Sequence, residues 1–571
     1  MRRGLSLLVL LLVVACAAPA PNVPTAPAGG GSSTAPNQPS APKRLRIGIV
    51  SNLPSPSNRL SAPLTGGPEL EQVVSAGLVA EDERRKMRAQ LAEAVPTIEN
   101  GQWRLLPDGR METTLRLREG VRWHDGTPLT ADDLVFSARV AMDRDLPAFG
   151  HLALNSVEGV EAVDPRTVLV RWKTPYIEAD TMFSTVVAVP LPRHLLERTY
   201  LEDKASFAQV SYWTTDFISN GPYKLREWQT ASYVLLDAFD QYVLGRPKID
   251  EIEVRFIADN NTMMANVLAD AIDLLIGIRH LSYDQAVEVR QRWRNGTAEF
   301  GPNGWYVTHP QLLNPSPTIV GNVQFRRALL MGLDRQAMTE TLAGGFAPVA
   351  HNILEPSDAE YQLTDPFVVK YDYDTRRATE LIQGLGYTKG SDGMFVDSAG
   401  QRLSIEIRGT GDVEQIVKHV SASQAYWQQL GLTVDPVVIP PQRQLDGPYR
   451  AAFPGFETLQ GGAGKTGLTA RHSSKARVPE NNFRGVGGIN YPRYQSAEHD
   501  ALIDRYLTTI PAAERLQLMG QIINHLTDQV LYMGLYYIAR PTVVTNRVTN
   551  VLGRNAGIVA TYNIHDWDAR P

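Results

Sequence analysis

The feature that most constrains the fold is the length of chain that must pack without a covalent cross-link. From Lys43 onward about 530 residues follow, whereas a single hydrophobic core seldom organises more than ~250–300 residues. The whole chain contains one cysteine, Cys16, so no disulfide can form within it. Hydrophobic residues make up 43% and charged residues 20% of the chain, as in ordinary globular proteins. We therefore expect two lobes or three domains whose cores alone supply the stability.

The first 42 residues have the composition of an export signal followed by a tether. Arg2 and Arg3 precede a short apolar run, and Val13-Val14-Ala15-Cys16 resembles a bacterial lipobox, in which the cysteine becomes the lipidated N-terminus. The apolar run is too short for a transmembrane helix of about 20 residues. Ala, Pro, Gly, Ser, Thr and Asn dominate the residues that follow, which predicts a flexible chain. We expect a signal peptide over 1–15, lipidation at Cys16 and a disordered linker over 16–42.

The charge balance and the hydropathy pattern limit the possible partners. The formal net charge is −5, with 56 Lys and Arg against 61 Asp and Glu, so the chain lacks the basic excess of nucleic-acid-binding proteins. No other apolar run approaches 18 residues. We expect an extracytoplasmic protein, in the periplasm or at the cell surface, that meets the membrane only through its lipid anchor and binds no nucleic acid.

The most specific stretch is residues 119–145, together with the strand before it. Asp125-Gly126 is a turn dipeptide, and Thr130 with Asp133 three residues later is typical of a helix N-terminus. Apolar residues then recur at helical spacing. The preceding strand has one apolar face: Met111, Thr113, Leu115, Leu117. The helix has an apolar stripe: Leu134, Val135, Ala138, Ala141, Met142. The segment predicts a strand, a turn and a capped helix.

This segment resembles the signature region of the family 5 extracellular solute-binding proteins, the peptide and nickel group of ABC importers. Further segments resemble that family in the order that the family uses: 219–228 (SNGPYKLREW), 247–276, 323–335 (VQFRRALLMGLDR), 373–387 and 563–567 (NIHDW). Each match alone is weak. Together they extend over most of residues 45–567, and such an ordered set is improbable by chance.

The resemblance implies an α/β, bilobal, periplasmic-binding-protein type II-like fold with a discontinuous first domain and mixed sheets. Matching segments place domain I at 43–83, 214–306 and 534–571, domain II at 84–213, and domain III at 307–533. Clefts between domains are preferred ligand sites, so we expect a solute to be enclosed between the lobes by hinge closure.

Three patterns that could suggest catalysis or a cofactor have simpler structural explanations. His124-Asp125 beside Asp132-Asp133 could form an acid/base pair. The turn already accounts for Asp125, however, and the helix cap already accounts for Asp133. Residues 461–467 contain Gly-Lys-Thr, but Leu459 stands where a phosphate loop needs glycine, so we expect a flexible glycine loop. The eleven histidines are scattered and no nucleophile motif occurs. We expect no metal site, no cofactor and no enzymatic activity.

Aromatic residues at the expected domain crossings are the candidate ligand contacts. Trp305, Tyr306 and His309 lie where members of the family cross from domain I to domain III, and Tyr536 and Tyr537 lie at the return crossing. Rigid aromatic rings supply large contact areas in small-molecule sites. The alternative for each residue is an ordinary core position.

The sequence departs from the peptide-binding members of the family in domain III. Those members commonly carry an acidic residue there that pairs with the ligand's α-amino group. The corresponding region of this chain has no aspartate between Arg450 and Arg471, and Glu457, next to Phe456, is the only acid nearby. Either Glu457 substitutes for the aspartate, with Phe456 lining the same site, or the ligand is not held by a free amino terminus.

These observations predict a monomeric substrate-binding lipoprotein of an ABC importer. It would capture a peptide or another polar solute between its lobes and deliver the solute to the permease subunits in the membrane. One alternative is an extracytoplasmic ligand sensor on the same fold. Another is a secreted hydrolase on a binding-protein scaffold, although the sequence offers no nucleophile for it.

Overall fold

The computed structural model describes residues 42–60, 66–277, 280–483 and 489–570. The predicted signal peptide, the lipidation site Cys16 and all but the last residue of the predicted linker lie outside the described residues. In the part of the chain that the structure describes, every helix is too short or too polar to cross a bilayer.

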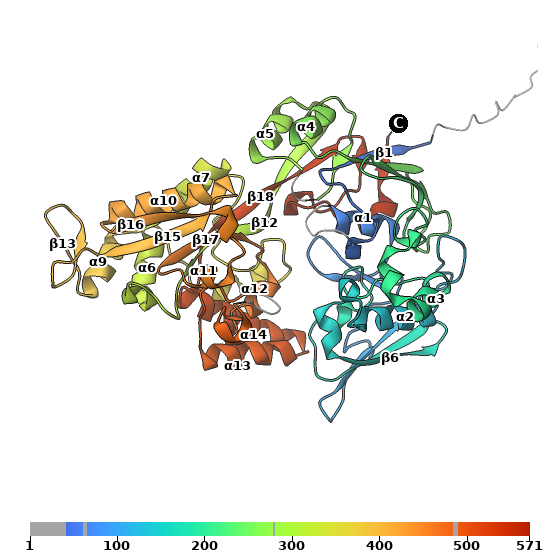
Figure 1. The fold of residues 1–571 in the computed structure, drawn as a ribbon, viewed down its shortest axis with the longest axis horizontal. Helices are drawn as coiled ribbons and strands as arrows, with labels where there is room; N and C mark the ends of the chain where they lie inside the picture. Colours follow the sequence, from blue (N-terminus) through green and yellow to red (C-terminus); the bar gives the residue numbers. More distant parts are fainter. Residues whose placement is uncertain (1–41, 61–65, 278–279, 484–488, 571) are drawn as a thin grey trace, which may run out of the picture. The chain divides into compact units, whose positions relative to one another are not determined.

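A ten-stranded mixed sheet connects most of the molecule (Figure 1). Its strands, in spatial order, are β16 (Thr433–Ile439), β15 (Ser404–Thr410), β17 (Phe456–Gly461), β12 (Gly296–Pro310), β18 (Met533–Thr545), β11 (Leu274–Leu275), β1 (Arg44–Ile49), β10 (Glu251–Phe256), β9 (Tyr233–Ala238) and β8 (Tyr223–Gln229). Parallel and antiparallel pairs both occur, because β1 runs parallel to β10 whereas β10 runs antiparallel to β9. The sheet confirms the prediction of an α/β fold with mixed sheets.

Two long antiparallel strands, β12 and β18, carry the chain from one lobe to the other. Their register breaks between Pro302 and Trp305, where β12 contains a bulge. Gly304 in this bulge has a φ of +80°, and a Cβ there would lie 2.9 Å from the carbonyl oxygen of Gly461. Only glycine allows both this φ and this close approach to Gly461. The bulge therefore sets the position of β12 beside the end of β17.

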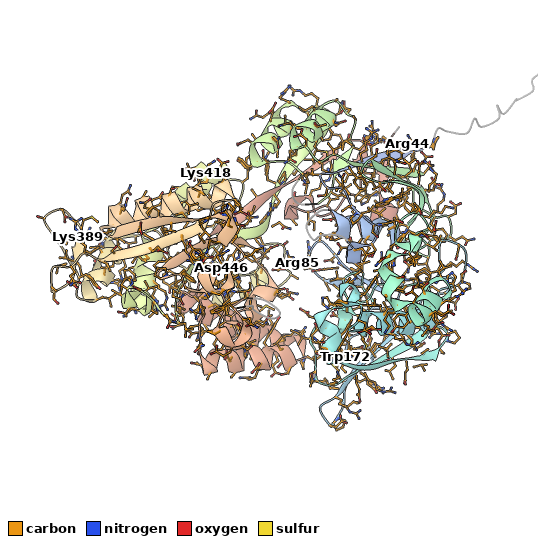
Figure 2. All side chains as sticks on the ribbon, viewed as in Figure 1. Arg44, Arg85, Trp172, Lys389, Lys418 and Asp446 are labelled. Carbon is orange, nitrogen blue, oxygen red and sulfur yellow. The ribbon has the colours of Figure 1, made fainter. Side chains whose placement is uncertain are left out.

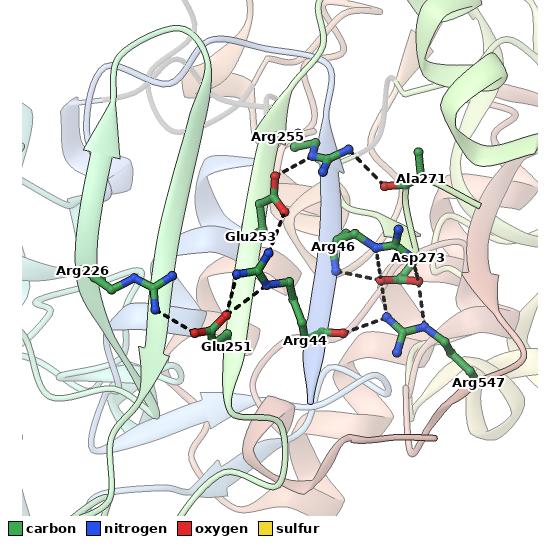
Figure 3. A network of polar contacts seen from close by, with 9 residues as sticks. All are labelled: Arg44, Arg46, Arg226, Glu251, Glu253, Arg255, Ala271, Asp273 and Arg547. Carbon is green, nitrogen blue, oxygen red and sulfur yellow. Dashed lines mark hydrogen bonds and ion pairs between the residues drawn. The ribbon is translucent and has the colours of Figure 1, made fainter. Parts of the chain in front are cut away.

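The first lobe joins segments that are far apart in the sequence. Its hydrophobic core contains residues of four strands, β1, β8, β9 and β10. These pack against residues near the C-terminus, including Val544, Ile564 and Trp567. Figure 3 shows the polar counterpart of this core: Asp273 accepts hydrogen bonds from the side chains of Arg46 and Arg547. These bonds outweigh burial, which acts in the opposite direction, and hold the pKa of Asp273 below 3.8. Three separate parts of the chain therefore depend on one another in this lobe.

A second, four-stranded sheet lies within the first lobe and contains the most specific stretch of the sequence. Its strands are β4 (Trp103–Leu105), β5 (Met111–Arg116), β7 (Thr167–Trp172) and β6 (Val157–Asp164). Alternate residues of β5 are buried as predicted, and the Asp125-Gly126 turn closes with Gly126 N–H donating to Trp123 O at 2.9 Å. Helix α2 (Ala131–Met142) is capped by the preceding residue, Thr130, whose N–H donates to the Asp133 carboxylate at 2.8 Å. Strand, turn and capped helix are confirmed, but Met142 is exposed because α2 ends there.

The second lobe has two hydrophobic cores, one on each face of β12, β17 and β18. One core contains Tyr306, Phe456 and Trp427 and is covered by the helices α6 (Val323–Met331), α7 (Arg335–Ala343), α9 (Thr375–Gly384) and α10 (Glu414–Leu430). The other contains Trp305 and Tyr537 and is covered by α13 (Ala497–Thr508) and α14 (Ala512–Asp528). The alternation of side chains along β12 therefore sends Trp305 and Tyr306 into different cores.

The remaining helices and strands are short or peripheral. The helices are α1 (Gly67–Val74), α3 (Arg193–Glu202), α4 (Asn260–Leu268), α5 (Tyr283–Arg292), α8 (Tyr361–Thr364), α11 (Gly447–Ala451) and α12 (Lys465–Thr469). The strands form three pairs: β2 (Val79–Glu81) with β3 (Met87–Ala89), β13 (Thr388–Lys389) with β14 (Phe395–Val396), and β19 (Val548–Thr549) with β20 (Asp568–Ala569).

Candidate functional site

Strand β17 has an open edge at its C-terminal end. On one side β17 pairs with β12 along its whole length, from Phe456 to Gly461. On the other side β15 pairs only with residues 456–458. Within the described residues no strand pairs with residues 459–461 on that side, and Gln460 and Gly461 are half-buried while Gly462 is exposed. An unpaired edge of this kind is a template for another extended chain.

The register shows which main-chain groups face the open side. Gln311 N–H donates to Gly455 O, so the odd-numbered residues of β17 exchange hydrogen bonds with β12. Phe456 and Thr458 therefore point their main-chain groups toward β15, and Gln460 points its N–H and C=O past the end of β15. One donor and one acceptor are thus available at Gln460 for a ligand with a peptide-like backbone.

A cavity of about 750 Å³ has Asp358 in its lining, and Asp358 lies beside Gly464, three residues beyond the end of β17. Its lining comes from the turn between β2 and β3, the beginning of β12, the loop before α8 and a segment after β19: Glu83, Arg84, Glu299, Pro302, residues 356–359, Gln362 and residues 551–556. The volume is within the range of small-molecule sites, ~300–1,000 Å³. Both lobes contribute to the lining, as expected for a site at a domain interface.

Acidic side chains gather between this cavity and β17. Glu355 and Asp358 are 1% and 3% exposed, and burial raises the pKa of both carboxyl groups. The loop that carries them is anchored, since Gly464 N–H donates to Ile353 O at 2.7 Å and Gly304 N–H donates to Glu355 Oε1 at 2.8 Å. Two buried carboxylates are therefore held in fixed positions beside Gly464.

Arg85 of the first lobe supplies the positive charge for these carboxylates. Figure 2 shows where Arg85 lies in the fold. It bonds to Glu355 through Nη2, and its Nε lies 3.5 Å from Asp358 Oδ1. Arg85 sits in the tight turn between β2 and β3 with a φ of +56°, and Asp82 caps this turn by accepting from the backbone of residues 84 and 86. A Cβ at Gly464 would lie 2.7 Å from Arg85 Nη1, so this guanidinium fills the space beside Gly464.

Glu457, the acid that the sequence singled out, lies at the other end of β17. Its side chain is 2% exposed, and its two carboxylate oxygens accept bonds from Arg408 and Arg450. Both oxygens are committed to these guanidinium groups, so Glu457 has no free oxygen for the amino group of a ligand. The neighbouring Phe456 is fully buried and packs on Trp427, with ring centroids 5.2 Å apart.

The aromatic candidates are core residues whose exposed fractions do not exceed 7%. Trp305 pairs with Gly461 at the open edge, and its ring packs edge-on against Tyr532 at 4.8 Å. Tyr537 donates its hydroxyl to the carbonyl oxygens of Asn352 and Leu354, both at 2.7 Å. Trp305 and Tyr306 are the cross-strand neighbours of Gly461 and Gln460 at the open edge, and Tyr537 supports the loop that carries Glu355.

Tyr306, Tyr536 and His309 make their ring contacts in the interior of the second lobe. Tyr306 stacks on His419 at 4.2 Å, and the hydroxyl of Tyr536 is 2.6 Å from His419 Nε2, so both tyrosines support the core under α10. His309 stacks on Tyr491 at 5.3 Å, on the face of β12 that carries Trp305. Their roles as direct ligand contacts stay predictions.

Sequence reasoning missed Arg85, Glu355 and Asp358. Arg85 and Glu355 are 270 residues apart, and no local pattern relates them. The prediction of a flexible glycine loop over 461–467 is wrong for its second half, since Lys465–Thr469 forms α12. Burial lowers the pKa of His124 to about 4, and Nε2 bonds to Gly221 O, which agrees with a structural role. Among the described residues no cluster of His, Cys, Asp or Glu has the arrangement of a metal site.

Comparison with known proteins identifies the fold and the family. The family model described as bacterial extracellular solute-binding proteins, family 5 Middle, matches residues 91–459. The oligopeptide-binding protein AppA of Bacillus subtilis (strain 168) is 22% identical over 510 residues, 86% of each chain. Its structure in complex with a nonapeptide covers 93% of this chain and 100% of AppA at 20% identity, with a TM-score of 0.64.

Two further proteins extend this comparison. The glutathione-binding protein GsiB of Escherichia coli (strain K12) is 26% identical over 319 residues, 55% of this chain and 56% of GsiB. HbpA2 from Haemophilus parasuis has a TM-score of 0.74 at 18% identity, covering 92% of this chain and 100% of HbpA2. The structural matches establish the bilobal fold, and the match to the family model covers more than half of the chain. The chain belongs to the family 5 bacterial extracellular solute-binding proteins.

Proposed function

We propose that this protein captures a peptide, or another polar solute with an extended amide backbone, and delivers it to the permease of an ABC importer. The observation that carries the proposal is the open edge of β17 at Gln460, beside a cavity to which both lobes contribute. Main-chain hydrogen bonds at a sheet edge bind an extended peptide irrespective of its side chains. The site therefore suits solutes that share a backbone and differ in their side chains.

The compared proteins support a solute of this kind. AppA is described as oligopeptide-binding and its structure holds a nonapeptide, while GsiB is described as glutathione-binding. A ligand favours the closed arrangement of two lobes only through contacts that it makes with both. The cavity meets this requirement, because Glu83 comes from the first lobe and Asp358 from the second.

The same proposal includes the cellular setting expected from the sequence. An exported monomer held at the membrane through Cys16, with the following linker as a tether, would stay near its permease at high effective concentration. The division into domain I (43–83, 214–306, 534–571), domain II (84–213) and domain III (307–533) stays a prediction. So does the absence of enzymatic activity.

The first experiment is mass spectrometry of small molecules released from the purified full chain. The proposal expects peptides or peptide-like solutes among them. The recovered solute is then used in calorimetric titrations of two variants. Gln460→Pro removes the N–H that faces the open side, whereas Gln460→Ala keeps the main chain and removes only the side chain. Because this N–H is outside the ladder with β12, proline is tolerated at the edge.

We expect Gln460→Pro to lose about 0.5–1.5 kcal/mol of binding, or roughly three- to tenfold in Kd, and Gln460→Ala to lose much less. Equal affinities of the two variants for the recovered solute would show that the main chain of Gln460 is not used. Trp305 is tested as Trp305→Phe, because truncation of a fully buried Trp to Ala costs ~3–5 kcal/mol of folding stability.

A further inference from the structure

The second lobe contains buried positive charge that no acid of the chain neutralises. Arg471 is 5% exposed, and among the described residues it makes one hydrogen bond, from Nη1 to Ile489 O at 3.3 Å, while its Nε has no partner there. Arg477 is half-buried, and its Nε also lacks a partner in the described part of the chain. Neither guanidinium forms an ion pair within the described residues, and the undescribed segments contain neither Asp nor Glu. The missing partner is therefore not an acidic side chain of this protein.

The acid closest to this pair is already neutralised. Electrostatic effects from Arg408, Arg450 and Glu457 all reach Arg477, so these four groups share one neighbourhood. Glu457 carries one negative charge, and Arg408 and Arg450 both bond to it. Burial lowers the pKa of Arg471 to about 10, which leaves Arg471 charged at neutral pH. The neighbourhood therefore has a net positive charge in a region of low water content, which is costly without a counter-ion.

Two other buried arginines of the same lobe show how this protein usually satisfies such groups. Arg326 donates to the carbonyl oxygens of Val320, Gly321 and Gln529. Arg335 donates to those of Gly534 and Tyr371. Backbone carbonyls thus take the place of acids at both positions. Arg471 has one such contact, and Arg477 makes no hydrogen bond within the described residues, so the pair stands apart from these arginines.

Aromatic rings position the pair. The guanidinium of Arg477 lies over the ring of Tyr491, 5.2 Å from its centroid, and His309 stacks on the same ring at an interplanar angle of 6°. The pKa of His309 is lowered by burial first and by Arg471 second, which places Arg471 near the same stack. Planar guanidinium groups held in this way match the geometry of carboxylate and other oxoanions.

We propose that Arg471 and Arg477, arranged around Tyr491, form a subsite for a carboxylate or another oxoanion. The anion is either a carboxylate of the captured solute or a free inorganic ion. Trp305, Val307 and His309 follow one another along the same face of β12, at about 7 Å for every two residues, so His309 beside the subsite is about 14 Å along the strand from Trp305 at the open edge. In the first case the inference rests on the proposed function, because the solute then reaches from the open edge to the arginines.

The test uses the full chain with inorganic phosphate and acetate as probes, at constant ionic strength, in calorimetric titrations. Arg477→Gln removes the half-buried member of the pair, and Arg471→Gln removes the buried one. Arg505→Gln is the matched control, because Arg505 is an exposed arginine of α13 in the same lobe without an ion pair in the described residues. We expect saturable binding of phosphate that weakens at least about tenfold in Arg477→Gln and is unchanged in Arg505→Gln.

Absence of saturable binding of both anions, or equal affinities of Arg477→Gln and Arg505→Gln, would overturn the inference. Should Arg471→Gln fail to fold, the comparison of Arg477→Gln with the control still decides. A second series uses one peptide with a free and with an amidated C-terminus. A loss in Arg477→Gln confined to the free acid assigns the anion to the solute, and a loss confined to phosphate assigns it to a free ion. Failure of all peptides to bind contradicts the proposed function alone, because the phosphate series does not depend on it.

Discussion

The two ends of β17 in the second lobe compensate buried charge in different ways. Beside Gly464, the buried carboxylates of Glu355 and Asp358 receive Arg85 from the first lobe. At the opposite end, Glu457 is saturated by Arg408 and Arg450 of its own lobe, and further arginines remain without acids. The acidic end therefore depends on a distant segment, whereas the basic end is complete within its lobe and has positive charge in excess.

This difference gives the strand an electrostatic direction. A solute lying along the open edge would have acidic groups near one end and arginines toward the other. Zwitterionic peptides carry opposite charges at their two ends, so the arrangement favours one orientation of such a solute. The two ends also differ in which parts of the chain their ion pairs join. The ion pairs of Arg85 join the two lobes, so a ligand bound between the lobes can alter them, whereas the ion pairs of Glu457 lie inside one lobe and hold β17 in place.

The largest effect is expected from Glu457→Gln. Removing the carboxylate that pairs with both Arg408 and Arg450 leaves these buried arginines without that ion pair, and breaking a buried pair in this way typically costs ~3–5 kcal/mol. The free energy of unfolding of the full chain, measured with urea, reports this loss. Glu202→Gln is the control, since Glu202 pairs with Arg198 in full solvent contact and should change stability little. A loss for Glu457→Gln no larger than for the control would contradict the account of the basic end.

An intermediate effect is expected from Arg85→Met, which keeps an unbranched apolar stem and removes the charge. Glu355 and Asp358 would lose their ion-pair partner, and an unsatisfied buried group costs about 1–3 kcal/mol. The urea-derived free energy of unfolding at pH 7 measures this loss. The solute affinity of the same variant shows whether the bridge from the first lobe also contributes to binding.

The acidic end also predicts a dependence of this effect on pH. Burial already raises the pKa of Glu355 above 4.5 and of Asp358 above 3.8, so the folded state binds these protons more tightly than the unfolded state. The resulting cost is present above the unfolded pKa values and is relieved as the pH falls toward them. Loss of Arg85 raises both folded pKa values further. The stability of Arg85→Met should therefore recover more steeply than that of the wild type between pH 7 and 5, and parallel curves would refute this assignment.

The sequence predicts local structure better than it predicts this pairing of charges. The strand, the turn at Asp125-Gly126 and the cap at Thr130 follow from neighbours in the chain, and the structure confirms them. For the aromatic residues at the domain crossings, the sequence allowed either a ligand contact or a core position. It could not decide between them, because burial depends on which face of β12 each helix covers. The contact of Arg85 with Glu355 joins residues 270 positions apart, and a tertiary contact at that separation leaves no periodic signal.

Glu457 shows the same limit from the opposite direction. Its isolation among basic and apolar residues made it the natural candidate for a ligand's amino group. Arg450 lies only seven positions away, yet nothing in the sequence indicates that it bonds to Glu457 in place of solvent. Arg408 approaches from a neighbouring strand, 49 positions earlier. Whether an acid is available to a ligand depends on such partners, and they become visible only once strand order is known.

The smallest effect is expected from Lys465→Gln at the acidic end. Lys465 pairs with Glu360 at 2.8 Å, but the two side chains are 32% and 26% exposed, so water screens the pair and its removal should cost ~0–1 kcal/mol. The comparison with Arg85→Met is informative because both cations face the same acidic group of residues. A double-mutant cycle between the two substitutions measures whether they share that role. Additive losses would assign the charge compensation of Glu355 and Asp358 to Arg85 alone. A loss for Lys465→Gln as large as that for Arg85→Met would instead make the acidic end self-sufficient within the second lobe, and its contrast with the basic end would disappear.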